Sequence, residues 1–161
     1  MRNSRPSIVL DDTQARLRMD HLVKAAADWS PVTEVLSHKL RNSVVDNFDA
    51  GGRYDRAGSI SGGTKTWAAK ADGTQSYLQA SGILRGSILP EHDTDTATVS
   101  TNIEYAARMN FGQEVAERSS LLTRRVKAAG GTPARPFMVV QDEDVQEAKR
   151  LGREHLLGEG A

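Results

Sequence analysis

The chain contains no cysteine among its 161 residues. Disulfide bridges, thiolate zinc sites and cysteine nucleophiles are therefore excluded together. Net charge is lacking as well, because 21 Lys and Arg are matched by 21 Asp and Glu. A neutral chain has no overall basic field to draw it onto nucleic acid. It also resists self-association only weakly, which suits a protein whose natural state is assembled.

Long apolar runs are also missing. No stretch approaches the roughly 18 consecutive apolar residues of a membrane-spanning helix. Near the N-terminus only Ile8, Val9 and Leu10 form an apolar run between charged residues, and this run is too short for a secretory signal. We therefore expect a protein that is soluble in the cytoplasm where it is made. At this length we expect a single domain, residues 1–161, with one core.

One glycine-rich segment, residues 58–66 (GSISGGTKT), is close to a phosphate-binding loop. In such a loop the second glycine is followed at once by Lys and then Ser or Thr, whereas here Thr64 lies between Gly63 and Lys65. The preceding residues 53–56 are polar, although a true phosphate-binding loop follows a buried strand and opens a helix. We therefore expect no nucleotide or other cofactor here and interpret the segment as part of a flexible loop.

Catalytic and metal-binding patterns are lacking too. The chain has no Gly-x-Ser-x-Gly elbow, and Ser81 and Ser119 have no recognisable base beside them in the sequence. His92 lies among acidic residues, which favour turns by bonding to their own backbone. The other histidines do not share the i, i+4 spacing of a helical metal site: His21, His38 and His155. We expect no catalytic residue, no metal ligand and no enzymatic activity.

Two helices are expected in the first third of the chain. The first is capped by Asp12 or Thr13 and carries a moderate apolar pattern toward Trp29. The second begins at Ser30-Pro31, since Ser is a good cap and Pro is tolerated in the first helical turn. Its apolar residues recur every four positions, and it ends at Gly51-Gly52: Val32, Leu36, Leu40, Val44 and Phe48.

The second half of the chain predicts short strands and two further helices. Ile83-Leu84 is expected as a strand entry, and residues 87–90 and 97–101 as a hairpin. A short helix is expected within 103–111, and a buried strand over 137–140. A capping box of Asp144 with Glu147 then opens a C-terminal helix. The fold class is therefore α+β, with a small antiparallel sheet and helices packed on it.

Three segments are expected as an arm and two long loops. Residues 1–11 form the arm, and residues 51–73 form a loop of Gly, Ser and Thr pinned by Trp67. Residues 113–132 mix small and charged side chains, with the cations Arg118, Arg124, Arg125 and Lys127 and the anions Glu114 and Glu117. Long loops in compact domains are often binding segments. We expect both to grip neighbouring proteins on assembly, and we attribute the glycines of the first to conformational freedom.

Arg135 lies in the segment Pro133-Ala134-Arg135-Pro136. Proline fixes its own φ and restricts the residue before it, so this arginine is presented from a stiff extended backbone. It is either part of a rigid entry into the core before Phe137 or a preorganised arginine at an interface, where arginines are often hot spots. We expect the interface role.

The order of these pieces resembles the phage virion morphogenesis, or tail completion, family, whose members look like neck proteins of long-tailed bacteriophages. The resemblance covers roughly residues 15–158. Its most specific motifs are residues 81–88 (SGILRGSI), Tyr105-Ala106 with Phe111-Gly112, and residues 134–137 (ARPF). The chain departs from the family's usual pattern around Trp67, where a Pro-Asp-Gly-like turn and a Lys-rich stretch are missing.

The resemblance implies a non-enzymatic virion protein of the head-tail connector, a ring of copies around the DNA channel. Its implied partners are itself, neighbouring neck and tail proteins, and DNA passing without sequence-specific binding. It would reside in the virion neck or tail, and in the host cytoplasm during assembly. The expected interface residues are Arg135, Arg118, Arg124, Arg125, Lys127, Glu114, Glu117 and Lys65. The expected structural anchors are Phe48, Trp67, Gly82, Tyr105, Phe111, Gly112 and Phe137.

Two other functions stay open. A tail terminator at the end of the tail tube is also a small ring-forming α+β protein, so sequence does not separate it from a connector. A DNA-binding accessory factor would use the basic residues 118–127, but acidic neighbours dilute this segment and no aromatic residue lies within it for base stacking.

Overall fold

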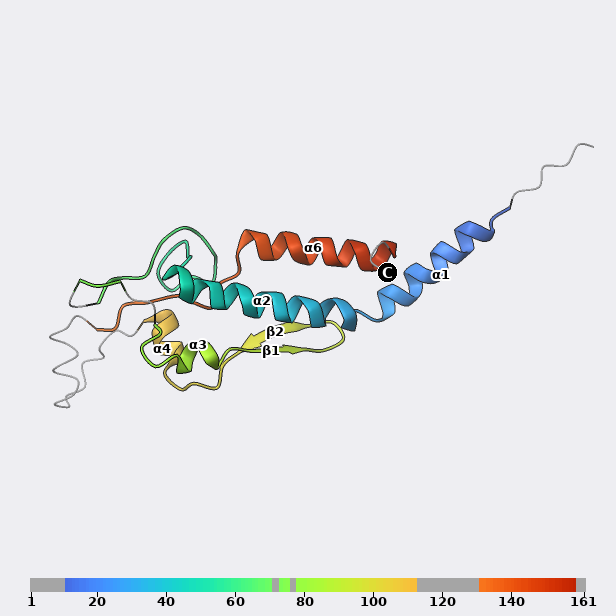
Figure 1. Cartoon of the computed structure of the whole chain (residues 1–161). Coiled ribbons are helices and arrows are strands. Elements are labelled where there is room, and N and C mark those ends of the chain that lie inside the picture. The colour runs from blue at the N-terminus through green and yellow to red at the C-terminus, as the bar shows by residue number, and fades with distance from the viewer. Residues whose placement is uncertain (1–10, 71–72, 76–77, 113–130, 159–161) are drawn as a thin grey trace, which may run out of the picture.

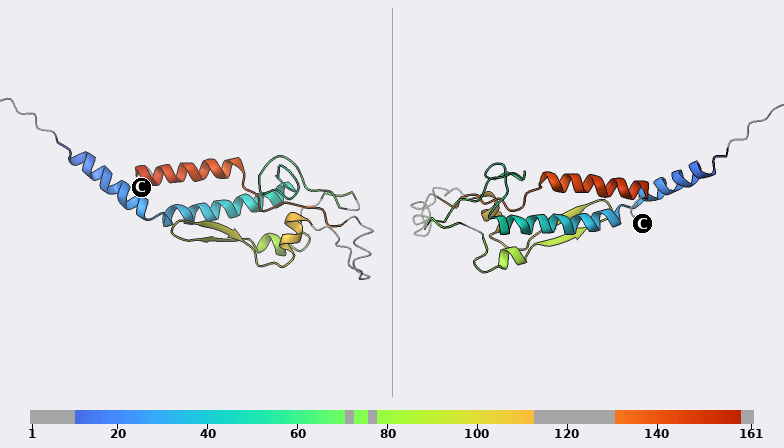
Figure 2. Two further views of the ribbon diagram at one scale, coloured as in Figure 1. Left: turned by 180° about the vertical axis from the view of Figure 1, so that it is seen from behind. Right: turned by 45° about the horizontal axis from the view of Figure 1, so that its top comes forward.

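A long helix forms the axis of the protein. The computed structural model describes residues 11–70, 73–75, 78–112 and 131–158. Helix α2 has α6 along one side and the β1–β2 hairpin along the other, and α1 extends beyond its N-terminal end (Figures 1 and 2). The fold is a small α+β fold, as expected. Its elements are α1 (Thr13–Ala27), α2 (Ser30–Ala50), α3 (Ile83–Gly86), β1 (Leu89–His92), β2 (Ala97–Ser100), α4 (Ala106–Phe111) and α6 (Asp142–Leu157).

Helix α2 begins at Ser30 and ends at Ala50, as the sequence predicts, but the expected capping role of Ser30 is wrong, because Ser30 is the first helical residue and Trp29 is the N-cap. The Asp28 Oδ1 accepts a hydrogen bond from the Ser30 N–H at 2.9 Å, and Gly51 ends the helix in the left-handed conformation with φ 70°. Because the helix is covered on two sides, it buries polar side chains as well as apolar ones. Val44 and Phe48 enter the core, while Asn47 is fully buried between them and α6.

The hairpin is confirmed. Strand β1 pairs antiparallel with β2, with Leu89 opposite Ser100 and His92 opposite Ala97. The Thr33 Oγ1 donates to the Asp93 carbonyl oxygen at 2.6 Å, which fixes the turn to α2. The expected strand entry at Ile83-Leu84 is wrong, because Ile83–Gly86 is a helical turn, α3, entered through left-handed Gly82 (φ 69°).

The strand expected over residues 137–140 is wrong, although Phe137 and Val139 are buried. A strand needs its backbone groups for a neighbouring strand, and here side chains use them. The Asn110 Oδ1 accepts hydrogen bonds from the N–H groups of Phe137 and Met138, each at 3.0 Å. Within the described residues, only an isolated parallel bridge joins Val140 to Ser61.

The capping box of α6 lies three residues earlier than expected. Gln141 is the N-cap and Asp144 is the third helical residue. The Asp144 Oδ2 accepts a hydrogen bond from the Gln141 N–H at 2.8 Å. Glu147 therefore does not cap the helix, and its carboxylate forms ion pairs with Lys39 and Arg150 instead.

Residues 51–67 do not form the flexible loop that the composition suggested. Tyr54 and Lys65 exchange backbone hydrogen bonds of 3.3 and 3.0 Å, and the Gly62 N–H donates to the Val140 carbonyl at 2.9 Å. The Trp67 N–H closes the segment by donating to the Gly51 carbonyl at 2.8 Å. This part of the loop is thus ordered within the subunit, before any assembly.

Gly62 and Gly63 of this loop serve close packing rather than freedom to adapt. A Cβ added to Gly63 would lie 2.7 Å from the backbone of Tyr54. One on Gly62 would lie 2.1 Å from the Gln141 side chain. A Cβ contact shorter than 3 Å forces the neighbouring atoms to move. Both Gly62 and Gly63 are therefore required, because Gln141 and Tyr54 pass close to them.

We expect Gly63→Ala to lower the free energy of unfolding by about 1 to 3 kcal/mol, because the added methyl group overpacks a backbone crossing. Gly86→Ala is the matched control, since a Cβ there meets nothing within 4 Å. It should be neutral or stabilising by up to about 1 kcal/mol. Urea titrations of both variants decide: equal effects would mean that the loop adapts to the new methyl group.

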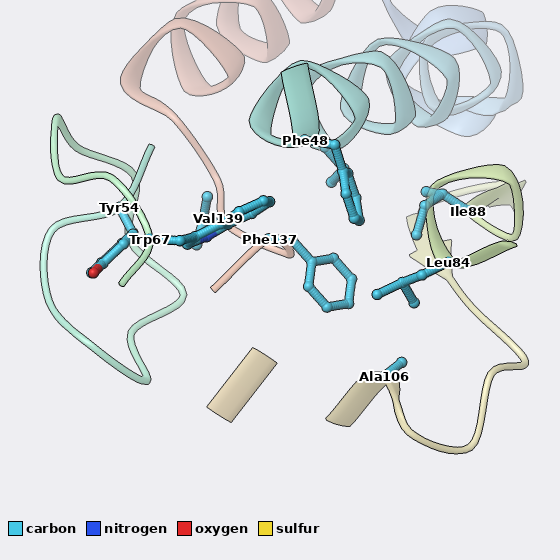
Figure 3. Close-up of a cluster of buried hydrophobic side chains, with 9 residues drawn as sticks. Phe48, Tyr54, Trp67, Leu84, Ile88, Ala106, Phe137 and Val139 are labelled. Atoms are coloured by element: carbon cyan, nitrogen blue, oxygen red, sulfur yellow. The ribbon is translucent and has the colours of Figure 1, made fainter. Parts of the chain in front are cut away.

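The core lies where the loop, α2, α3 and α4 meet the segment before α6 (Figure 3). Phe48 packs against Trp67 edge to face with ring centroids 5.6 Å apart, and against Phe137 at 5.2 Å. The nine buried members are Val44, Phe48, Tyr54, Trp67, Leu84, Ile88, Ala106, Phe137 and Val139. Each of the three specific sequence motifs contributes to this cluster, so their order in the chain reflects one shared core.

Candidate assembly surfaces

A buried polar network joins α2, the 51–67 loop and α6. The Asn47 side chain donates to the Phe137 carbonyl at 2.7 Å. Its Oδ1 accepts hydrogen bonds from the Arg53 Nε at 2.9 Å and the Gln141 Nε2 at 3.3 Å. Gln141 also donates to the Arg53 carbonyl at 2.7 Å. Sequence analysis missed this network because a buried Asn has no sequence pattern of its own.

Arg53 extends the network to the surface. Its guanidinium forms an ion pair with Glu143 at 2.6 Å and donates to the Ser43 carbonyl at 3.2 Å. The Ser43 hydroxyl in turn donates to Asp144 at 2.9 Å. These groups bond to one another and hold the loop in place, and Ser43, Glu143 and Asp144 also line an open pocket of about 450 Å³ between α2 and α6.

A second charged group lies on the outer side of α2 and α6. Glu147 forms ion pairs with Arg150 and Lys39, and Arg150 also pairs with Glu154. The hydrogen bonds from Arg150 and then Lys39 lower the pKa of Glu147 to about 2. The pair Lys39–Glu147 ties α2 to α6 across the surface.

This lowered pKa predicts a pH dependence. A carboxyl group whose folded pKa is depressed adds stability above its ordinary pKa, and that stability is lost as the pH falls from about 4.5 toward 2. We expect Glu147→Gln to remove this contribution, so the variant should lose less stability than the parent between about pH 6 and pH 3. Denaturant midpoints at the two pH values measure it, with exposed Glu34→Gln as control; parallel curves for parent and E147Q would contradict it.

The expected interface residues fall into two groups. Lys65 has an exposed side chain, and Arg135 is half-buried with its Nε 3.4 Å from the Ala68 carbonyl. Partial burial lowers the pKa of Arg135, which stays charged. The others lie outside the described residues: Arg118, Arg124, Arg125, Lys127, Glu114 and Glu117.

The expected anchors divide between core and surface. Phe48, Trp67 and Phe137 are buried, and the Trp67 Nε1–H donates to the Pro136 carbonyl at 2.8 Å. Gly112 has φ 77°, and an added Cβ would lie 2.8 Å from the Ala134 backbone nitrogen, so this glycine joins two motifs. Left-handed Gly82 opens α3.

Two expected anchors are wrong in that role. Tyr105 is 40% exposed and Phe111 is 57% exposed. Both flank α4, a short helix whose buried residues are Ala106 and Asn110. The small alanine packs against the core where the large aromatic residues were expected, and this leaves Phe111 on the surface.

Phe111 borders an apolar groove of about 490 Å³ beside α4. Ile60 from the loop, which is 64% exposed, and Met138, which is half-buried, also line this groove. The remaining lining comes from β2, α4 and the segments beside them: Ser100, Thr101, Ile103, Glu104, Ala106, Ala107, Asn110 and Phe137. We call this surface the α4 groove.

Helix α1 forms a second exposed surface at the other end of the protein (Figure 1). One face is held to α6, because the His155 Nε2–H lies 2.9 Å from the Ala25 carbonyl and 2.8 Å from that of Asp28. The His155 ring also packs against Trp29 at 5.5 Å. The rest of α1 is exposed, and Ala25 is its one buried residue.

The near-phosphate-binding segment does not open a helix. Residues 61, 62 and 65 form backbone bridges, and the chain then runs on extended to Trp67. Across the described residues, no three His, Asp or Glu side chains gather to hold a metal ion. None of the helices in that part of the chain is long and apolar enough to cross a membrane.

Comparison with known proteins gives the same family as the order of the sequence motifs. The model of the phage virion morphogenesis family matches residues 10–157. The chain is also 27% identical over 126 residues to the Mu-like prophage FluMu G protein 2 of Haemophilus influenzae, covering 78% of this chain and 77% of that protein. No solved structure is significantly similar. Since the family match covers nearly every described residue, this protein belongs to the phage virion morphogenesis family, a family of structural and assembly proteins of virions.

Proposed function

We propose that the protein completes the tail in the neck of the virion, as a ring of copies that joins the DNA-filled head to the tail. The observation that carries this proposal is the family match over residues 10–157, which takes in the whole described fold. The exposed apolar surfaces at both ends of the subunit support it, because large exposed apolar patches mark interaction sites.

A ring suits the physical character of the chain. Rings form through heterologous interfaces, in which one surface of a subunit meets a different surface of the next. The formal charge of zero allows copies to approach without strong repulsion. A lumen without strong positive charge lets DNA pass, since many phosphate contacts would hold it.

Deletion of the gene tests the proposal. We expect full heads and separate tails of normal length, and restoration of joined particles when the wild-type gene is supplied. Tails of irregular length would instead indicate a tail terminator, because such a protein ends the tail tube. Normal particles without the protein would overturn the proposal, and duplex DNA binding that weakens with salt would favour an accessory DNA-binding factor.

Arg135 provides a test at one residue. Its side chain makes one long hydrogen bond to Ala68, so we expect Arg135→Ala to change the melting temperature of the isolated protein little. If the guanidinium contacts a neighbour, the variant should complement the deletion poorly. A large drop in melting temperature would show that Arg135 serves the fold instead, and Arg135→Lys separates charge from the planar guanidinium.

A further inference from the structure

Helix α1 carries an apolar stripe that the described residues of its own subunit leave exposed. Ala15, Met19, Leu22, Val23 and Ala26 follow the spacing i, i+4, i+7, i+8 and i+11, which lines one face of a helix. All five are exposed, with Met19 at 65% and Val23 at 69%. The face held to α6 contains Ala25 and the carbonyl that His155 contacts, and Leu22 lies at its border, because it lines a hollow with residues of α6.

An isolated helix of this length is marginal in water. Helix α1 has 15 residues, and among the described residues it contacts α6: His155 bonds to its C-terminal end, and Leu17, His21 and Leu22 line a hollow with Leu156 and Leu157. In both orientations of Figure 2 it projects past the end of α2. A further partner for the stripe would therefore stabilise the helix itself, and that partner must come from outside the subunit.

The α4 groove is the complementary surface. It is lined largely by apolar side chains, including exposed Ile60 and Phe111. It lies at the end of the molecule opposite α1, where α4 and the loop meet (Figure 1). The distance between the two ends prevents α1 from filling the groove of its own subunit.

The α1 stripe and the α4 groove also have charges of opposite sign beside them. Arg16, which pairs with Asp12 at 2.8 Å, and Arg18, which lines the hollow next to α6, stand on either side of the apolar stripe. Glu104 is the charged residue in the lining of the groove, and it is exposed. An arginine next to the docked stripe can therefore pair with this carboxylate at the rim, which favours one orientation of the helix.

We propose that α1 of one copy docks its apolar stripe into the α4 groove of a second copy. The contact joins two different surfaces at opposite ends of the molecule, so it is heterologous, repeats from copy to copy, and forms a ring where the rotation between copies closes. The proposal rests on the ring-forming function proposed above. It identifies which surfaces of the subunit make the ring.

The lack of cysteine allows a direct test in the full-length protein. One population carries Met19→Cys on α1, and a second, enlarged by a tag, carries Phe111→Cys at the groove. The two are mixed at high concentration and treated with a short flexible bis-maleimide, which tolerates differences in register that a disulfide would not. We expect the yield of mixed cross-linked dimer to exceed the yield from a control mixture by about tenfold, because docking raises the local concentration of one cysteine around the other.

The control mixture pairs Phe111→Cys with Val35→Cys, since Val35 is 42% exposed on α2 and lies outside both surfaces. Adding Val23→Asp to the Met19→Cys chain should abolish the excess. The single chain with both cysteines should form a ladder of multimers. Equal cross-linking in the test and control mixtures, or a double variant that cross-links only within one chain, would overturn the proposal.

The result is separable from that of the gene deletion. Separate heads and tails on deletion, together with no excess of the mixed dimer, would leave the neck function standing and reject the α1 contact. Normal particles on deletion would reject the neck function, whereas the ladder would still establish the contact between copies.

Discussion

Replacing Trp67 with Ala is expected to lower the free energy of unfolding by about 3 to 5 kcal/mol, the usual cost of removing a buried tryptophan. Trp67 is 2% exposed and packs edge to face on Phe48. Its indole also lies against Gly52, where an added Cβ would be only 2.6 Å from the ring. Gly52 has no side chain that could fill the space left by the ring.

For a chain of this size the loss corresponds to a fall in melting temperature of about 6 to 20 °C. Differential scanning calorimetry measures it. Trp67→Phe separates two contributions, because it keeps an aromatic ring but leaves the Pro136 carbonyl without the indole N–H that now reaches it at 2.8 Å. We expect this variant to cost about 1 to 3 kcal/mol from the buried carbonyl and the smaller ring.

The outcome also tests how the loop is held. If Trp67 anchors residues 51–67, hydrogen exchange at Tyr54 and Lys65 should quicken in Trp67→Ala, because their paired backbone bonds depend on the loop's position. Unchanged protection there, with a loss of stability below about 1 kcal/mol, would mean that the backbone bridges alone fix the loop.

Helices α1, α2, α4 and α6 and the hairpin were predictable because their signals are local, whereas α3 was expected as a strand entry. Ser30-Pro31 and Gly51 bound α2 through backbone chemistry that acts within a few residues. Alternating residues near Val99 indicated a strand, and the partner strand lies a short turn away. The buried anchors Phe48, Trp67 and Phe137 were also predictable, since the chain has only two Trp and three Phe, but the same reasoning failed for Phe111, which is 57% exposed.

What the sequence did not reveal depends on distant partners. Residues 137–140 have the composition of a strand, but Asn110 takes the hydrogen bonds that a strand would need. The glycines of the loop gave no sign that Tyr54 and Gln141 would pass so close to them. The apolar pattern of α1 predicted a helix correctly, yet the pattern alone did not tell whether the same chain would cover it.

Asn47→Ala is the second substitution with a large expected effect, about 3 to 5 kcal/mol of unfolding free energy. The Asn47 side chain is fully buried and satisfies three groups at once: the Phe137 carbonyl, the Arg53 Nε and the Gln141 Nε2. Its removal leaves the carbonyl unpaired in the core, which costs about 1 to 3 kcal/mol, and deletes a hydrogen bond to a charged group, worth about 1.5 to 3 kcal/mol.

Asn42→Ala is a matched control, because Asn42 lies on the same helix with an exposed side chain. Its replacement should be neutral or slightly stabilising, since Ala has the higher helix propensity. A double-mutant cycle with Arg53→Ala then isolates the network. Because Arg53 also reaches Glu143 and Ser43, the two losses should overlap in part and leave an interaction energy of about 0.5 to 3 kcal/mol. If the two losses of stability are additive, Asn47 and Arg53 do not act together. Asn47 would then stabilise only the packing of α2 against Phe137, and other contacts would hold the loop to the helix.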